Sequence, residues 1–290
     1  MATRSRLRFG MQLPVQAQSS LFAEPWEASA GRDELAQVAR AADAAGFDYL
    51  AVCDHVAIPE SHAPSMGTTW YDTIATLGWL AGITERVRLL SHVYVVAYRH
   101  PLQTAKAFAS LDELSGGRVI LGVGAGHLEP EFELLGVPFT ERGRRADETI
   151  DAIRAAFRDE FGCPGFGQRP RPRQAGGPPI WVGGSSNAAI RRAAERGDGW
   201  LPQGTLKKDM PAAIERLRKL RAEAGRDDRP FTIGAIAPSL SGPASKLTAY
   251  LRDYAAMGVD QVQVRFPARS CDELCDQIAA FASDVGPELE

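Results

Sequence analysis

Short apolar runs rich in β-branched residues alternate along the chain with longer segments whose apolar residues recur at helical spacing. In the first long segment this spacing is shown by Leu35, Val38, Ala39 and Ala42. The short runs predict eight strands, at residues 7–13, 48–53, 87–96, 118–123, 179–183, 198–202, 231–237 and 259–265. The segments between and after them predict eight helices, near residues 32–45, 72–84, 101–114, 141–158, 187–196, 209–224, 244–257 and 271–284.

Eight strands that alternate with eight helices predict a closed parallel (β/α)8 TIM barrel. An open parallel sheet with helices on both faces is the alternative, because strand counts from one sequence are error-prone. Glycines mark the ends of several predicted helices, at Gly46, Gly116-Gly117, Gly197 and Gly258. No linker divides the sequence, so we expect one domain over residues 1–290.

The composition is that of a globular protein, with 44% hydrophobic and 24% charged residues, which is enough apolar material for a large core. A net charge of −3 provides no basic field for nucleic acid or an anionic membrane. No apolar run approaches the roughly 18 residues of a membrane helix, and the basic N-terminus lacks the apolar region of a signal peptide. We therefore expect a cytoplasmic protein with reduced cysteines, at Cys53, Cys163, Cys271 and Cys275.

Two segments are too long to be ordinary connections between elements. Residues 14–31 follow the first predicted strand, which places them at the catalytic face of a barrel, where they could form a lid. Residues 161–179 are rich in Gly, Pro and Arg and follow a helix, so they begin at the opposite face. We expect a solvated surface loop there, although it could also wrap back toward the catalytic face.

Candidate chemistry gathers where the predicted strands end, which is where a barrel places its active site. The second strand runs into Asp54-His55, and a carboxylate beside an imidazole can orient a ligand and move protons. A loop histidine that caps a helix or binds water is the other reading. The third strand is long enough to predict a bulge, and its His92 either faces the barrel mouth or packs inside it.

The fourth strand opens into Gly124, Gly126 and His127. Glycines at alternate positions would let a flat ligand approach the backbone closely, although glycines at a strand end also form simple tight turns. The spacing is not that of a Rossmann fingerprint. His127 lies where the strand enters the following loop, and it is a candidate to face a substrate.

The fifth strand ends in Gly183, Gly184 and Ser185 and is followed directly by a helix. Backbone N–H groups, hydroxyls and a helix N-terminus together favour an anion such as phosphate. A plain N-cap at Ser186 or Asn187 is compatible with the same pattern. Lys207-Lys208, after the sixth strand, could add positive charge or simply be exposed.

Three stretches resemble the luciferase-like monooxygenase family, and within it the oxidoreductases that depend on the deazaflavin coenzyme F420. They are AADAAGFDYLAVCDHV, the stretch from ITERVRLLSHVYVVAYRHPLQ to TERGRRADETIDAI, and PPIWVGGSSNAAIRRAAERGDGWLP. The most specific portion runs from Arg99-His100-Pro101 to Ser115-Gly116-Gly117-Arg118. The resemblance covers residues 41 to 202 apart from the Gly/Pro/Arg-rich loop, and it implies a (β/α)8 barrel.

The resemblance also implies roles for several of these residues. Asp54 and His55 would lie near the cofactor ring, with Asp54 orienting the cofactor and His55 relaying a proton. A cis peptide at His92-Val93 would back the ring, and a histidine at position 92 departs from the small residue usual there. Gly183-Gly184-Ser185 resembles the cofactor phosphate site.

On the fourth strand, Gly124, Gly126 and Glu131 match the family's cofactor-binding pattern. His127 stands where some members have a carboxylate, so the acid-base chemistry of those members cannot be transferred to it directly. It remains a catalytic candidate. Pro130 replaces a polar residue of some relatives, which implies the loss of one cofactor contact.

The predicted activity is hydride transfer between reduced F420 and a small organic substrate, by a homodimer. The nearest alternative is a two-component monooxygenase that receives reduced FMN from a partner reductase. Alternatives of other classes are a metal-dependent barrel hydrolase, which would use histidines at the strand ends, and a cofactor-binding protein without turnover. We expect no metal.

Overall fold

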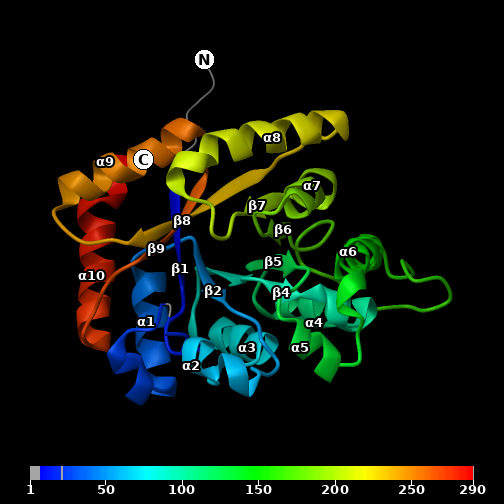
Figure 1. Cartoon of the computed structure of the whole chain (residues 1–290), viewed down its shortest axis with the longest axis horizontal. Helices are drawn as coiled ribbons and strands as arrows, with labels where there is room; N and C mark the ends of the chain where they lie inside the picture. The colour runs from blue at the N-terminus through cyan, green and yellow to red at the C-terminus, as the bar shows by residue number, and fades with distance from the viewer. Residues whose placement is uncertain (1–6, 21, 290) are drawn as a thin grey trace.

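The structure is a computed structural model that describes residues 7–20 and 22–289, and its parallel strands close into a barrel surrounded by helices (Figure 1). The strands are β1 (Arg8–Gln12), β2 (Tyr49–Val52), β3 (Arg88–Ser91), β4 (Tyr94–Val95), β5 (Val119–Gly124), β6 (Ile180–Gly183), β7 (Gly199–Leu201), β8 (Thr232–Ser239) and β9 (Gln261–Arg265). Pairing of β3 with β5 completes the ring. The predicted (β/α)8 barrel is therefore confirmed, and the open-sheet alternative is excluded.

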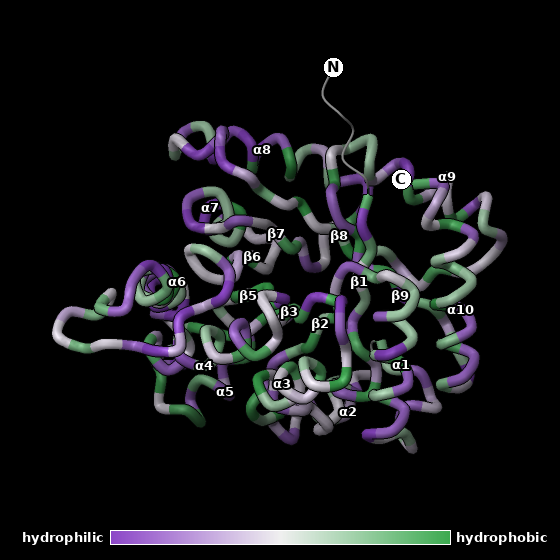
Figure 2. Tube along the Cα trace, turned by 180° about the vertical axis from the view of Figure 1, so that it is seen from behind, coloured by the Kyte–Doolittle hydropathy of each residue, from purple (hydrophilic) through white to green (hydrophobic). Residues whose placement is uncertain are grey.

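The helices that alternate with the strands begin and end within one residue of their predicted bounds. They are α1 (Arg32–Ala44), α3 (Thr73–Ile83), α4 (Pro101–Leu114), α6 (Arg142–Arg158), α7 (Asn187–Arg196), α8 (Met210–Glu223), α9 (Ala244–Met257) and α10 (Cys271–Asp284). Two short helices that the periodicity did not predict are α2 (Ala63–Met66) and α5 (Glu129–Leu134). In Figure 2 the strands β2 and β5 are hydrophobic, whereas α7 at the periphery is hydrophilic.

The bore of the barrel is filled by side chains, so the site can lie only at its mouth. Tyr49 and Trp181 meet edge to face at the floor of the bore, with ring centroids 6.0 Å apart. Gly10 and Gly199 make room for these two rings, because a Cβ at either position would lie 2.3 to 2.5 Å from ring atoms. Ala51, Leu90, Ile120 and Leu201 complete this inner cluster.

The predicted third strand, residues 87–96, is divided into β3 and β4 by a bulge. Leu90 pairs with Ile120, but Tyr94 pairs with Val123, so the β3–β4 side of the ladder has one extra residue. The peptide bond between His92 and Val93, within this bulge, is cis. The bulge and the cis bond are thus both confirmed.

The two long loops lie on different parts of the surface. Residues 14–20 and 22–31 lie at the mouth, where Ala17 and Trp70 form an antiparallel bridge. The loop after α6 projects to the side (Figure 1), and the Gln168 side chain donates to the Leu102 carbonyl on α4. Among the described residues no helix is both long enough and apolar enough to cross a bilayer.

Candidate active site

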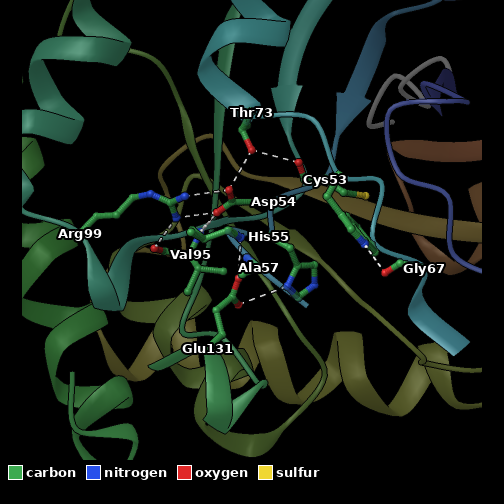
Figure 3. Close-up of polar contacts among 11 residues, drawn as sticks. Cys53, Asp54, His55, Ala57, Gly67, Thr73, Val95, Arg99 and Glu131 are labelled. Atoms are coloured by element: carbon green, nitrogen blue, oxygen red, sulfur yellow. Dashed lines mark hydrogen bonds and ion pairs between the residues drawn. The ribbon is translucent and has the colours of Figure 1, made fainter. Parts of the chain in front are cut away.

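Asp54 occupies the centre of a hydrogen-bond network at the end of β2 (Figure 3). Its carboxylate accepts bonds from the Thr73 hydroxyl at 2.9 Å, from the Val95 backbone N–H at 2.7 Å and from both terminal nitrogens of Arg99 at 2.6 and 2.9 Å. The side chain is only 2% exposed. The carboxylate is therefore used within the protein, and Asp54 can act on a ligand only by positioning β4.

Arg99 is also in contact with two aromatic rings. Its central carbon lies 3.9 Å from the ring centroid of Tyr94 and 4.8 Å from that of Tyr98. It also donates to the Val95 carbonyl at 2.9 Å. The bidentate geometry and the enclosing rings fix the direction of the chain through β4, because a planar guanidinium accepts few alternative orientations.

His55 is bonded to Glu131, which comes from the short helix α5 (Figure 3). Nδ1 of His55 lies 3.2 Å from Oε2 of Glu131, and Oε1 accepts the backbone N–H groups of Val56 at 2.5 Å and Ala57 at 3.2 Å. Burial raises the pKa of Glu131, but the bonds from His55 and the two amides outweigh it and hold that pKa below its usual value. An ionised carboxylate only accepts, so Nδ1 of His55 is the donor and Nε2 is free for chemistry.

Two further rings flank His55. Its ring centroid lies 4.5 Å from that of Trp70 and 5.6 Å from that of His127, both in edge-to-face arrangements. Partial desolvation and the neighbouring His55 lower the pKa of His127. His127 is therefore a neutral imidazole at neutral pH, placed beside His55 as the sequence predicted from its strand end.

The bulge places Val93 between the ends of β5 and β6, where glycines stand at positions 124 and 183. A Cβ on Gly124 would lie 2.5 Å from one γ-methyl of Val93, and a Cβ on Gly183 would lie 2.5 Å from the other. A Cβ on Gly126 would lie 2.6 Å from the Phe132 ring. These glycines thus have a packing reason that the sequence did not show, since they make room for the bulge before any ligand binds.

His92 lies inside the barrel and not on its rim. The residue is 8% exposed, and burial lowers the pKa of its imidazole to about 4, opposed by the amide of Gln263. It is therefore neutral at physiological pH and lies beneath the bulge. Of the two positions considered for His92, the structure supports packing within the mouth.

The turn after β6 retains part of the predicted phosphate site. The N–H of Gly184 donates to the Leu201 carbonyl at 3.0 Å, and the Ser185 hydroxyl donates to the Gln203 carbonyl at 2.7 Å. Ser186 is the N-cap of α7, and its hydroxyl accepts the N–H of Ala189. The amides that remain for an anion are those of the first turn of α7, which have no acceptor within the helix.

Lys207 is bonded elsewhere and does not add its positive charge to this turn, which corrects one of the two expectations for it. Its ammonium donates to the Tyr250 carbonyl at 2.9 Å and to the Asp253 carboxylate at 2.8 Å. The lysine therefore joins η5 (Lys207–Asp209) to α9. A positively charged side chain that does reach the start of α7 is Arg216, which donates to the Asn187 side chain.

The histidines and Asp54 do not form a metal site. Asp54 is bonded to Arg99, His55 to Glu131, and His92 is enclosed in the bore. Within residues 7–20 and 22–289, no three His, Cys, Asp or Glu side chains are grouped as metal ligands would be.

Sequence reasoning did not identify Arg99, Thr73 or Trp70 as parts of this site. Arg99 lies within the most family-specific phrase, so its position was visible but its partner was not. Thr73 begins α3 and contacts Asp54 only because β2 and α3 are adjacent in the barrel. Trp70 belongs to a loop without periodicity, and no pattern in the sequence marks it.

The comparisons with known proteins agree with this geometry. The luciferase-like monooxygenase family matches residues 7–266, and the chain belongs to it. The protein Rv0940c of Mycobacterium tuberculosis is 36% identical over 225 residues, 71% of this chain and 76% of that protein. The family assignment makes this chain an enzyme of the oxidoreductase or monooxygenase type.

Two solved structures share the fold over nearly the whole chain. The monooxygenase RslO1 from Streptomyces bottropensis has a TM-score of 0.78 at 22% identity, covering 98% of this chain and 100% of its own. The coenzyme F420-dependent tetrahydromethanopterin reductase from Methanopyrus kandleri has a TM-score of 0.76 at 18% identity, covering 99% and 100%. At such identities the likeness concerns the fold alone.

Replacing Arg99 with leucine should destabilise the protein by about 3–5 kcal/mol, because the buried Asp54 carboxylate would lose its partner. The measurement is urea denaturation followed by circular dichroism. Arg144→Leu, which removes an exposed i,i+4 pair with Glu148, is the matched control and should leave the free energy of unfolding unchanged. Equal effects of the two substitutions would contradict a central role for the Asp54–Arg99 pair.

Replacing Glu131 with glutamine should lower stability by about 1–3 kcal/mol at pH 7, since a charge-assisted acceptor of three bonds is lost. The folded-state pKa of Glu131 lies below its unfolded value of about 4.3. Its contribution is thus present above pH 4.3 and is lost as pH falls through the folded pKa. The difference between wild type and Glu131→Gln should therefore shrink below about pH 4, as measured by denaturation at several pH values. A constant difference would contradict the assignment.

Proposed function

We propose that this protein is an F420-dependent oxidoreductase, which transfers a hydride between the deazaflavin and a small organic substrate at the barrel mouth. The observation that carries the proposal is the juxtaposition of the Val93 bulge with the Glu131-bonded His55. The first gives a rigid apolar backing for a flat ring, and the second gives a proton donor or acceptor with a fixed tautomer. The F420-dependent reductase of the same fold supports this cofactor.

The residues at the mouth fit such a group on structural grounds. Val93, fixed between Gly124 and Gly183, would support one face of the ring, and the first-turn amides of α7 would receive a phosphate. When bound, reduced F420 supplies the hydride. Asp54 would act indirectly, because it anchors the N–H of Val95 directly after the bulge.

His55 is the residue that we assign to proton transfer. The Nδ1–H of His55 donates to Glu131, so Nε2 is the nitrogen that would exchange a proton with the substrate. The His55 imidazolium would give its Nε2 proton to the oxygen that becomes a hydroxyl, and the neutral ring would receive that proton in the reverse direction. Glu131 also stabilises the imidazolium through its negative charge. His127 is the second imidazole beside the same space, and it would contact the substrate.

Replacing His55 with glutamine should lower kcat by about 10²–10⁴-fold, because a positioned acid-base group is lost. The affinity for F420 should stay unchanged, since the ring backing and the phosphate turn remain. Stopped-flow absorbance of the cofactor gives kcat, and fluorescence titration gives the affinity. His62→Gln, in the neighbouring loop, is the control that should retain full activity. A loss of F420 binding equal to the loss of kcat would rule out a proton-transfer role.

Titration of the purified protein with F420 and, separately, with FMN tests the cofactor assignment. The fold is shared with a monooxygenase, so the second candidate is a two-component monooxygenase that receives reduced FMN from a partner reductase. Tight binding of FMN without binding of F420 would select it. The homodimer implied by the family resemblance stays a prediction, which analytical ultracentrifugation in the same buffer would test.

Replacing Gly183 with alanine should weaken F420 binding about tenfold or more, equivalent to about 1.4 kcal/mol. The added Cβ would lie 2.5 Å from Val93, so the bulge must shift from the position that supports the ring. Gly78→Ala on α3, where an added Cβ meets no atom within 4 Å, is the matched control. Unchanged F420 affinity in a folded Gly183→Ala protein would show that Val93 does not support the ring.

A further inference from the structure

The Trp70 ring is in direct contact with the His55 ring. The centroids of Trp70 and His55 lie 4.5 Å apart at an interplanar angle of 73°, so the two rings meet edge to face. Phe22 makes a second edge-to-face contact with Trp70, with ring centroids 6.3 Å apart. Aromatic side chains from three separate segments are thus in successive contact, from His55 through Trp70 to Phe22.

The indole is fixed in place by the backbone of two loops. Gln18 donates its N–H to the Thr69 carbonyl at 3.0 Å, and Tyr71 donates its N–H to the Gln16 carbonyl at 2.9 Å. These bonds enclose the antiparallel bridge between Ala17 and Trp70. The Trp70 indole N–H donates to the Gly67 carbonyl at 3.3 Å (Figure 3). A ring held in this way loses little conformational entropy when a ligand packs against it.

The described residues of the 14–31 loop, which form the bridge with Trp70 through Ala17, are themselves joined by hydrogen bonds. The buried Glu27 carboxylate accepts the N–H of Val15 at 2.6 Å and the N–H of Glu24 at 2.8 Å. The Gln18 side-chain amide donates to the Glu27 carbonyl at 2.8 Å. Val15, Gln18 and Glu24 are therefore all bonded to Glu27.

Large apolar side chains are exposed in the two segments that carry His55 and Trp70. Val56 is 52% exposed and Tyr71 39%, which is unusual for large apolar side chains next to a buried ionic network. The carboxylates of Asp54 and Glu131 are both satisfied within the protein. A charged substrate group placed here would lose its hydration without gaining a partner among these residues, which is unfavourable.

We propose that Trp70 is a specificity-determining residue, which together with Val56 selects substrates with an uncharged, apolar body next to the reacting carbonyl or alcohol. The proposal rests on the function proposed above and deepens it, since it names the class of substrate that the site accepts. The reacting oxygen lies toward Nε2 of His55, and the apolar body packs on the indole.

Binding can be tested without cofactor by fluorine NMR of protein labelled with fluorotryptophan. The chain has 5 tryptophans, and the Trp70 resonance is assigned by its loss in the Trp70→Phe variant. Cyclohexanone should shift this resonance at saturation, whereas oxocyclohexanecarboxylate, an anion of the same ring, should not. The Trp79 resonance, from α3, is the internal control and should not move. An unshifted Trp70 resonance with cyclohexanone would overturn the proposal.

Steady-state kinetics with reduced F420 supply the second test. Wild type should prefer cyclohexanone over the anion, and Trp70→Gln should lower kcat/KM for cyclohexanone about tenfold through KM, with little change for the anion. Trp70→Phe should restore most of the preference, and Trp79→Phe should leave it unchanged. An equal loss for both substrates would show a merely structural role and overturn the proposal.

The two proposals fail in different ways. If F420 does not bind and the Trp70 resonance still shifts with cyclohexanone, the cofactor assignment is wrong and the apolar subsite stands. If F420 is oxidised but Trp70→Gln does not alter the preference between the two ketones, the oxidoreductase function stands and the role of Trp70 is wrong.

Discussion

The bond between the Asp54 carboxylate and the N–H of Val95 is the contact on which the mouth of the barrel depends. It joins the end of β2 to the start of the chain after the bulge, and Arg99 holds the same carboxylate from the other side. A buried carboxylate is stable only when its acceptor positions are filled, so the chain after the bulge has little freedom. Val93 is consequently held at a fixed depth between Gly124 and Gly183.

A second buried carboxylate, that of Glu131, positions the loop that carries His55, as Asp54 positions the chain after the bulge. Glu131 bonds the N–H groups of Val56 and Ala57 and the imidazole of His55, so loop position and ring tautomer are set by one side chain. These two acids, one following β2 and the other in α5, organise different parts of the mouth through bonds within the protein. In both cases a charged group acts by orienting the chain and not by chemistry of its own.

The barrel itself could be predicted from the sequence because its signal is local. Apolar runs, helical spacing and glycines at helix ends define each element separately, and the order of elements defines the closed ring. The bulge was also visible, as an overlong third strand. The site was only partly predictable, because contacts such as Thr73 with Asp54 and Trp70 with His55 join segments whose proximity is a consequence of the fold.

The glycines and the charged residues show what residue type alone could not predict. Gly124 suggested the close approach of a flat ligand and Gly183 an anion-binding turn, and the structure shows that both also make room for Val93 of the same chain. Asp54 suggested a ligand-orienting acid, and its carboxylate is bonded to Arg99 within the protein. Once both acids are bonded internally, the groups left at the mouth are two imidazoles, an indole and aliphatic carbon. The proposed transfer of a hydride to an uncharged carbonyl would fit such a surface, since the His55 imidazolium would give a proton to the oxygen on which charge develops and the rest of the substrate would need only apolar contact.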